Sequence, residues 1–171
     1  MPVPELRGQR VTLRPARADD RDRLRDILAQ PGVARWWGPG SPDHAVDEWL
    51  TPDESVTFVI EVGAEVAGSI QYLEENGEDY RHASIDLFLD GEHQGHGLGP
   101  DAIRTVARHL FEDRGHHRLT IDPAASNERA IRAYERVGFR RVGRMRSYER
   151  GSDGTWHDGM LMDLLVGELN A

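Results

Sequence analysis

A loop with glycine at positions 95, 97 and 99 is the part of this sequence best suited to bind an anion. The residues before it, 84–90, alternate between apolar and polar and predict a strand. The residues after it, 103–111, repeat apolar side chains at helical spacing, and Pro100 falls in the first helical turn, where proline is tolerated. Backbone N–H groups between a strand and a helix N-terminus converge on one point, and the helix dipole adds positive charge there. The segment therefore predicts a phosphate site, where any side chain in place of glycine would hold the phosphate away from the backbone.

The residue types present exclude several other uses of such a loop. The dinucleotide pattern G-x-G-x-x-G is absent. All 21 basic residues are arginine, so there is no lysine for a Walker loop or for a Schiff base. The chain has no cysteine, which excludes a thiolate nucleophile and a zinc site of the cysteine type. The histidines lack a companion ligand motif such as H-E-x-x-H, and we expect no metal.

A second motif lies between residues 126 and 139. Ser126 or Asn127 is suited to cap a helix, and Gly138 is suited to end it. Asn127, Ile131 and Tyr134 are spaced i, i+4 and i+7, so they lie on one helical face. Without its flanking motif, Tyr134 would be read as a helix tyrosine that packs on a sheet.

The two motifs together resemble those of the GNAT superfamily of acyl-CoA N-acyltransferases. Gln94-x-x-Gly97-x-Gly99 is similar to the Q/R-x-x-G-x-G/A loop of that family, and N-x-x-A-x-x-x-Y-x-x-x-G-F, starting at Asn127, is similar to the motif that follows it. The resemblance extends over essentially the whole chain and implies one domain, residues 1–171. It implies an α/β (α+β) fold, with a central mixed, mostly antiparallel sheet of 6–7 strands flanked by about four helices.

The resemblance also implies a role for each matching residue. The co-substrate would be acetyl-CoA, and Tyr134 would protonate its departing thiolate. The backbone of residues 87–89 would pair with the pantetheine arm, the loop would hold the pyrophosphate, and Asn127 would hydrogen-bond the pantetheine. The full set of expected cofactor-binding residues is Leu87, Phe88, Leu89, Gln94, Gly95, His96, Gly97, Leu98, Gly99 and Asn127. Pro100 departs from a full set of phosphate donors, because it has no N–H.

Three short features are similar to the aminoglycoside 6'-N-acetyltransferases of this superfamily. They are Trp36-Trp37-Gly38, Ile85-Asp86, and Ile121-Asp122-Pro123 followed by Ser126-Asn127. The resemblance implies that Asp86 lies near the acceptor amine, that Asp122 is a second anion for the substrate, and that Trp36 and Trp37 flank it. Alternative interpretations are that both tryptophans pack on apolar surface and that Asp122 forms a turn before proline.

Asp86 is the expected base, although its role has two versions. An unperturbed aspartate has a pKa of about 3.9, and direct abstraction of a proton from an ammonium group of pKa ~8 would be uphill by roughly 5 kcal/mol. Amines already contain a few per cent of free base at neutral pH, so Asp86 can instead orient the amine or pass its proton through water. The alternative is a strand aspartate that bonds to a neighbouring backbone group.

The net charge of −9 argues against nucleic acid as a partner and is compatible with a polycationic small-molecule amine, although it equally serves solubility. The sequence shows neither a signal pattern nor a long apolar run, which favours a cytoplasmic protein without a membrane partner. Monomer and homodimer both remain open. Other acceptors also remain open: a protein N-terminus, a polyamine or a siderophore hydroxylysine. So does a non-catalytic GNAT-like domain that binds acyl-CoA.

The elements expected to position these residues follow from periodicity and from turn residues. Asp19 is expected to cap the first helix, and Pro31-Gly32 to end it. Residues 74–79 are expected to form an acidic loop close to the acceptor, and residues 150–158 a polar connection. The expected strands are 10–14, 55–62, 65–73, 84–90, 118–122, 140–145 and 159–166, with a further helix at 43–50.

Overall fold

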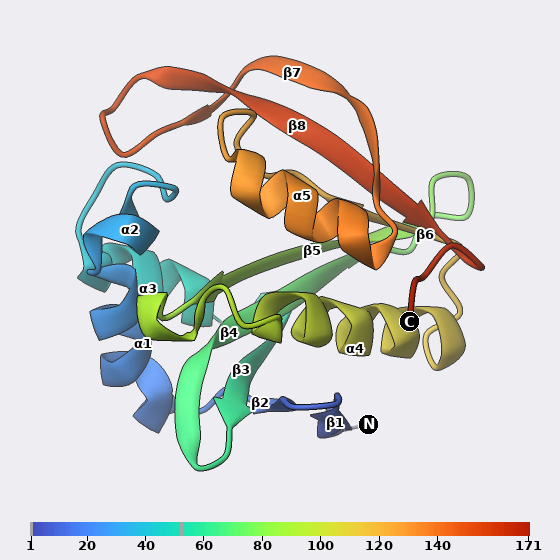
Figure 1. Cartoon of the computed structure of the whole chain (residues 1–171), viewed down its shortest axis with the longest axis horizontal. Helices are drawn as coiled ribbons and strands as arrows, with labels where there is room; N and C mark the ends of the chain where they lie inside the picture. The colour runs from blue at the N-terminus through green and yellow to red at the C-terminus, as the bar shows by residue number, and fades with distance from the viewer. Residues whose placement is uncertain (1, 52) are drawn as a thin grey trace.

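The computed structural model describes residues 2–51 and 53–171, which form one twisted sheet with helices on both faces (Figure 1). The strands lie in the order β1-β2-β3-β4-β5-β6-β8-β7. Their bounds are β1 Leu6–Arg7, β2 Thr12–Pro15, β3 Val56–Val62, β4 Glu65–Glu75, β5 His82–Leu89, β6 Arg118–Ile121, β7 Arg140–Arg150 and β8 Trp156–Leu165. The α-helices are α1 Arg21–Leu28, α2 Pro31–Ala34, α3 Pro42–Leu50, α4 Leu98–Glu112 and α5 Glu128–Val137.

Strand direction confirms the expected fold class. The neighbours β5 and β6 run parallel, whereas the other neighbouring pairs are antiparallel. The prediction of 6–7 strands and about four helices is slightly low, since the described residues form eight strands and five α-helices. The additional elements are short: β1 has two residues and α2 has four, which leaves no periodic signal to detect.

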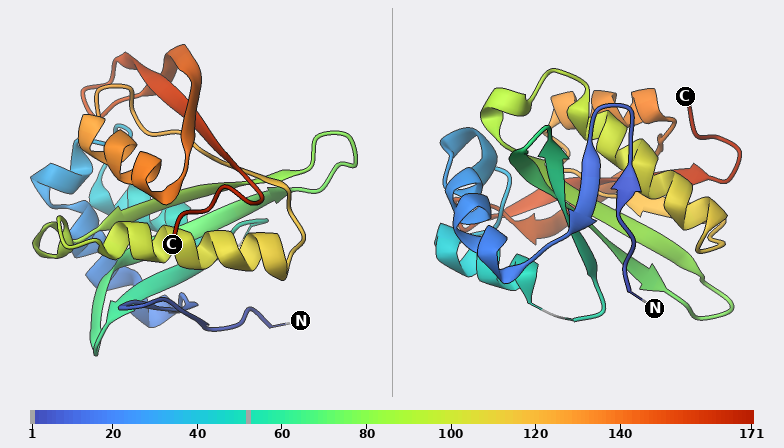
Figure 2. Two further views of the ribbon diagram at one scale, coloured as in Figure 1. Left: turned by 45° about the vertical axis from the view of Figure 1, so that its right-hand side comes forward. Right: turned by 90° about the horizontal axis from the view of Figure 1, so that it is seen from below.

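Two apolar cores lie on opposite faces of the sheet, and β5 contributes to both. Ile85 belongs to the larger core beneath α4 and α5, whereas Phe88 belongs to the smaller core beneath α1 and α3. Ile103 of α4 and Ile131 of α5 are fully buried in the larger core. Figure 2 shows α4 and α5 over one face, with α1 and α3 behind the other. The alternation along β5 is therefore confirmed, and Asp86 shares the side of Phe88.

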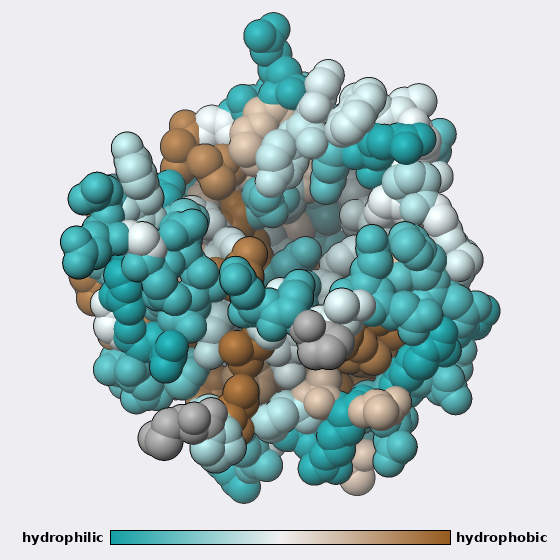
Figure 3. Space-filling model, turned by 180° about the vertical axis from the view of Figure 1, so that it is seen from behind, coloured by the Kyte–Doolittle hydropathy of each residue, from teal (hydrophilic) through white to brown (hydrophobic). Residues whose placement is uncertain are grey.

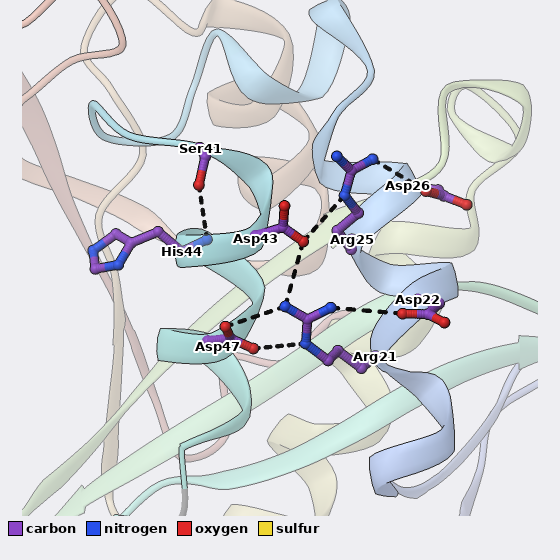
Figure 4. A network of polar contacts seen from close by, with 8 residues as sticks. All are labelled: Arg21, Asp22, Arg25, Asp26, Ser41, Asp43, His44 and Asp47. Carbon is purple, nitrogen blue, oxygen red and sulfur yellow. Dashed lines mark hydrogen bonds and ion pairs between the residues drawn. The ribbon is translucent and has the colours of Figure 1, made fainter.

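Ion pairs join α1 to α3 on the surface (Figure 4). Arg21 donates from Nε to Asp47 at 2.7 Å and from Nη2 to Asp43 at 3.3 Å. Arg25 also donates to Asp43, at 3.3 Å. Exposed pairs of this kind contribute little to the free energy of unfolding. They restrain how α3 lies against α1, and α3 carries Trp49 into the smaller core.

One prediction near the N-terminus is wrong. Asp19 does not cap the first helix, because the chain first makes a 3₁₀ turn at Ala18–Asp20. In this turn Asp20 accepts a hydrogen bond from the backbone N–H of Arg17 at 2.7 Å and pairs with Arg14 at the same distance. Pro31 follows the end of α1 as expected, but it also begins α2, since proline suits the first position of a helix.

The acidic stretch is a further correction. Glu74 and Glu75 belong to β4 rather than to a loop. Glu74 accepts hydrogen bonds from Arg114 at 3.0 Å and His116 at 2.6 Å, close to the end of α4. It therefore faces the side of the sheet opposite to Asp86, and its charge is already paired.

The last two strands form a longer hairpin than predicted. β7 continues to Arg150 and β8 begins at Trp156, where the sequence suggests only a polar connection. The extension consists mainly of polar and arginine side chains, and most of β7 is exposed. Such a stretch carries no alternation of apolar residues from which a strand can be read.

Candidate active site

The sheet divides between β5 and β6, and this division is the centre of the candidate site. The two strands pair only at Ala83 with Leu119 and at Ser84 with Thr120. Beyond Ser84 they separate, and within the described residues the backbone of 85–89 has no strand partner on that side. An unpaired strand edge offers N–H and C=O groups to an extended ligand. The geometry therefore suits the expected pairing of this edge with a pantetheine arm.

Two carboxylates stand on the two sides of the division. Continued past Ser84, the register of β5 and β6 would place Asp86 level with Asp122. The backbone of Leu87 donates to Oδ1 of Asp86 at 2.9 Å, so the expected alternative of a local backbone bond is present. The side chain keeps exposed surface, yet protein surrounds it closely. Burial, with smaller contributions from the charges of Asp122 and Glu149, raises the pKa of Asp86 to about 7.

Tyr134 of α5 faces the same division. Its ring lies against Phe139, with centroids 6.5 Å apart, and packs at the edge of the larger core. Burial raises the pKa of its hydroxyl, and the negative charges of Asp86 and Asp122 raise it further. Tyr134 therefore keeps its proton at neutral pH. It can donate a hydrogen bond to an atom on which negative charge develops.

The glycine loop has the geometry that an anion site needs. Gly95 and Gly97 both have a φ of 79°, a conformation that favours glycine, and Gly97 immediately precedes α4. A Cβ at Gly97 would lie 2.9 Å from Nη2 of Arg10, and one at Gly95 would lie 3.1 Å from Nη2 of Arg129. Two guanidinium groups thus flank the loop. Sequence reasoning misses both, because Arg10 is distant along the chain and arginine is too frequent to stand out.

A cavity of about 670 Å³ joins the loop, the free edge of β5 and α5. Of the expected site residues, Leu87, Phe88, Leu89, Gln94, Gly95, Gly97, Leu98, Gly99, Asn127, Tyr134, Trp36 and Trp37 line it. His96, Asp86 and Asp122 are not among the lining residues. His96 is exposed. The cavity therefore corresponds to the expected cofactor side of the site.

Two polar side chains of the cavity serve the local structure. Gln94 donates from Nε2 to the carbonyl of Leu89 at 3.0 Å and accepts from Arg129 at 3.4 Å, which braces the loop against β5 and α5. Oδ1 of Asn127 accepts from the backbone N–H of Ala130 at 3.2 Å, so Asn127 is the helix cap. Of the two capping candidates, Ser126 and Asn127, the second is confirmed.

The two tryptophans differ in their surroundings. Trp37 packs edge-on against Trp49 and Phe88, with centroids 5.3 and 5.5 Å apart, and so extends the smaller core. Trp36 is half-buried, and the guanidinium of Arg35 lies 4.5 Å from its ring centroid. Packing on apolar surface therefore accounts for Trp37, while Trp36 keeps exposed surface beside the cavity.

A group that sequence reasoning misses lies next to Asp122. The hydroxyl of Tyr148 donates to Oδ2 of Asp122 at 2.5 Å. Burial raises the pKa of Asp122, although the hydrogen bond from Tyr148 opposes this effect. Burial also raises the pKa of Glu149, and the charge of Asp122 raises it further. The strand β7 thus adds two titratable residues to the two carboxylates expected here, and no sequence signal points to them.

Seen from behind, the molecule is hollowed below the β7–β8 hairpin, and most of the surrounding surface is hydrophilic (Figure 3). Among residues 2–51 and 53–171, no three histidine, cysteine, aspartate or glutamate side chains are grouped to hold a metal ion. In the same part of the chain, none of the helices combines the length and apolar character needed to cross a membrane.

Comparison with known proteins agrees with this geometry. Residues 10–140 match the family model for the acetyltransferase (GNAT) domain. Over 151 residues the chain is 31% identical to aminoglycoside N(6')-acetyltransferase type 1 of Klebsiella pneumoniae, which covers 78% of this chain and 75% of that protein. It is 26% identical over 135 residues to spermidine N(1)-acetyltransferase of Escherichia coli strain K12, covering 75% of this chain and 72% of the relative.

Solved structures give the same picture. RimJ of Mycobacterium smegmatis, determined in complex with CoA-disulfide, superposes with a TM-score of 0.83 at 26% identity. The superposition covers 99% of this chain and 89% of that one. The similarity therefore extends over the whole fold and is not confined to one motif.

Proposed function

This chain belongs to the GNAT family of acetyltransferases, and from that membership we propose that it transfers the acetyl group of acetyl-CoA to a primary amine of an aminoglycoside-like polycation. The observation that carries the proposal is the pair of carboxylates, Asp86 and Asp122, on the two sides of the strand division beside Tyr134. The charge of Asp122 raises the pKa of Asp86, and a cationic ligand between the two carboxylates would relieve this repulsion. The reaction proceeds within one catalytic domain, residues 1–171, by direct attack in a ternary complex.

The binding of acetyl-CoA is assigned to the cavity. The free edge of β5 at residues 87–89 pairs with the amide groups of pantetheine, and the loop at 94–99 binds the pyrophosphate through backbone N–H groups. Pro100 supplies no N–H, and the guanidinium groups of Arg10 and Arg129 add positive charge beside the loop. These features support a diphosphate ligand: the glycines leave room for it and the arginines neutralise it.

The chemistry moves one proton from the amine to the leaving sulfur. The amine nitrogen forms a bond to the acetyl carbon, and the carbon–sulfur bond breaks. With a pKa of about 7, Asp86 accepts the amine proton at far lower cost than an ordinary aspartate would, directly or through water. Tyr134 stays protonated and gives a hydrogen bond, then its proton, to the thiolate. Uptake of the proton by Asp86 and binding of an ammonium group at Asp122 remove negative charge near Tyr134, and this lowers the pKa of Tyr134 towards the value needed for transfer.

A panel of acceptors tests the proposal. Release of free thiol from acetyl-CoA is measured with kanamycin-like aminoglycosides, spermidine and short peptides at equal concentrations. We expect the highest kcat/KM for the aminoglycosides, and a strong loss for Asp86→Asn with little change in the affinity for acetyl-CoA. Turnover of peptides alone, by enzyme that binds coenzyme A, would overturn the choice of acceptor.

A linear polyamine is the second candidate acceptor. The spermidine acetyltransferase relative supports it, because that protein matches three quarters of this chain. Both acceptors carry several ammonium groups, so the paired carboxylates suit either one. Half-buried Trp36 favours the aminoglycoside, since an indole ring packs well on a sugar ring. A Trp36→Ala variant that loses aminoglycoside turnover but keeps spermidine turnover would separate the two.

A further inference from the structure

Tyr148 reaches Asp122 because β7 is irregular at this point. Met145 lies opposite Gly159 and Glu149 opposite His157, so the stretch 145–149 of β7 contains two more residues than the stretch of β8 that it faces. A bulge of this kind redirects side chains out of the regular alternation. Within it, Ser147 has a φ of 47°, the left-handed region that residues with a side chain rarely adopt.

The bulge is held in place by Asp158 of β8. Its Oδ1 accepts from the backbone N–H of Ser147 at 2.9 Å, and its Oδ2 pairs with Arg144 at 3.0 Å. The backbone carbonyl of Asp158 accepts from Ala125 at 2.9 Å, just after Asp122. One residue therefore fixes both the bulge and the segment that carries the carboxylate. A strained conformation that surrounding contacts hold in this way is often found at functional sites.

Gly159 provides the space that the ring of Tyr148 occupies. A Cβ at this position would lie 2.9 Å from Cδ2 of Tyr148 and 3.2 Å from Cε of Met145. The first distance is shorter than real Cβ contacts, so the ring of Tyr148 would have to move; the second is tight. The φ of Gly159 is not positive, so its lack of a side chain serves this contact rather than a turn.

The hydrogen bond from Tyr148 restrains a carboxylate, Asp122, that has other anionic side chains close to it. Asp122 has Asp86 on β5 and Glu149 on β7 as anionic neighbours, and the hydroxyl of Tyr134 on α5 also senses its charge. A carboxylate in such surroundings tends to take up a proton. A donor fixed on Oδ2 favours the ionised form and leaves Oδ1 able to accept from a second donor.

We propose that Tyr148 is a positioning residue of the acceptor site, which orients Asp122 through Oδ2 so that Oδ1 binds an ammonium group of the acceptor. The inference rests on the proposed function and deepens it: the β7 bulge, and not only the strands β5 and β6, determines how well a polycation binds. Tyr148 touches neither the donor nor the reacting atoms, and its effect passes through Asp122.

The test compares Tyr148→Phe with Tyr80→Phe as a matched control, because Tyr80 is 82% exposed on the loop after β4. Binding of kanamycin and of spermine to the coenzyme A complex is measured by calorimetry, and rates are measured with each acceptor that the unmodified protein acetylates. For Tyr148→Phe we expect roughly 5–20-fold weaker binding and a matching rise in KM for the acceptor. The KM for acetyl-CoA and the melting temperature should stay unchanged.

The pH profile provides a readout that a purely structural role would not alter. Loss of the hydrogen bond raises the pKa of Asp122, so the anion is lost at a higher pH as the solution is acidified. The acid limb of kcat/KM for the acceptor should therefore move to higher pH in Tyr148→Phe and not in Tyr80→Phe. In an Asp122→Asn background, Tyr148→Phe should add little, since the two residues act together.

Three outcomes would overturn the inference. Tyr148→Phe could bind polycations as tightly as the unmodified protein and show the same pH profile, or its KM could rise equally for acetyl-CoA and for the acceptor. The effects of Tyr148→Phe and Asp122→Asn on acceptor binding could also be fully additive. Failure of the proposed function looks different. In that case the unmodified protein acetylates none of the polycations, while the calorimetric comparison still tests whether Tyr148 affects their binding. If the unmodified protein binds neither kanamycin nor spermine, the role of Tyr148 falls together with the acceptor class.

Discussion

In the proposed reaction Asp86 gives the base and Tyr134 the acid of one proton transfer, and their surroundings raise the pKa of both groups. The raised pKa of Asp86 suits it to act as a base near neutral pH. The raised pKa of Tyr134 keeps its hydroxyl protonated until negative charge develops on the sulfur. The same buried, anionic environment produces both effects.

Removal of the hydroxyl of Tyr134 should separate catalysis from binding. Tyr134→Phe keeps the ring that packs near Phe139, so we expect unchanged affinity for acetyl-CoA. Without the acid, kcat should fall by roughly 10²–10⁴-fold. Steady-state rates and calorimetric titration with coenzyme A check both statements, with Tyr80→Phe as control. A kcat within twofold of the unmodified protein would return Tyr134 to a packing role.

The pKa of Asp86 should be visible in the dependence of rate on pH. The pKa of Asp86 is raised to about 7, so the carboxylate form is lost as the pH falls through about 7. The acceptor amine also loses its proton as the pH rises, and the two ionisations together should give log kcat/KM a slope approaching two on the acid side. In Asp86→Asn the ionisation of Asp86 no longer contributes, and the slope should fall by one. Equal slopes in both proteins would argue that Asp86 only orients the amine.

Among the elements, the loop between β5 and α4 has the clearest structural requirement. Gly97→Leu places a side chain at a φ of 79° and within 2.9 Å of Arg10. Coenzyme A should raise the melting temperature of the unmodified protein by mass action, and this shift should disappear in the variant. Gly143→Ala is the control, because a Cβ there meets nothing within 4 Å. A normal shift in Gly97→Leu would contradict the loop assignment.

The sequence predicts those elements whose side chains alternate or repeat against a core. Alternation locates β5 through Ile85 and Phe88, and the spacing of Asn127, Ile131 and Tyr134 locates α5 with its cap and its stop. The second half of β7 lies beyond this kind of inference, because its arginine and polar residues are mostly exposed and its backbone pairs with β8 alone.

The same limit applies to the candidate site. Residues on local motifs, such as Gly97 and Tyr134, could be found from the sequence. Arg10 and Tyr148 reach the site only through tertiary contacts. Arg10 precedes β2 and lies next to the glycine loop, whereas the position of Tyr148 depends on the β7 bulge and on Gly159. No local pattern in the sequence indicates that a side chain of β7 will reach past the neighbouring strand β8 to a carboxylate at the end of β6.

For the whole molecule, the net charge of −9 should affect acceptor binding over a distance. A polycation is attracted by many carboxylates together, and added salt screens this attraction. Between about 50 and 500 mM salt, the KM for a polycationic acceptor should rise several-fold more than that for a monoamine. Initial rates across a salt series measure the difference. Parallel changes for the two acceptors would limit the role of charge to the site itself.

The division between β5 and β6 has a consequence for the order in which the substrates add. Two residue pairs join these strands, while the carboxylates that receive the acceptor belong to opposite sides of the gap. We expect acetyl-CoA, bound along the free edge of β5, to fill the gap as an additional strand and to fix the distance between Asp86 and Asp122. The acceptor site is then complete only in the donor complex, and addition should be compulsory, with acetyl-CoA first. A non-reactive acceptor analogue should inhibit uncompetitively against acetyl-CoA, whereas a noncompetitive pattern would indicate random addition.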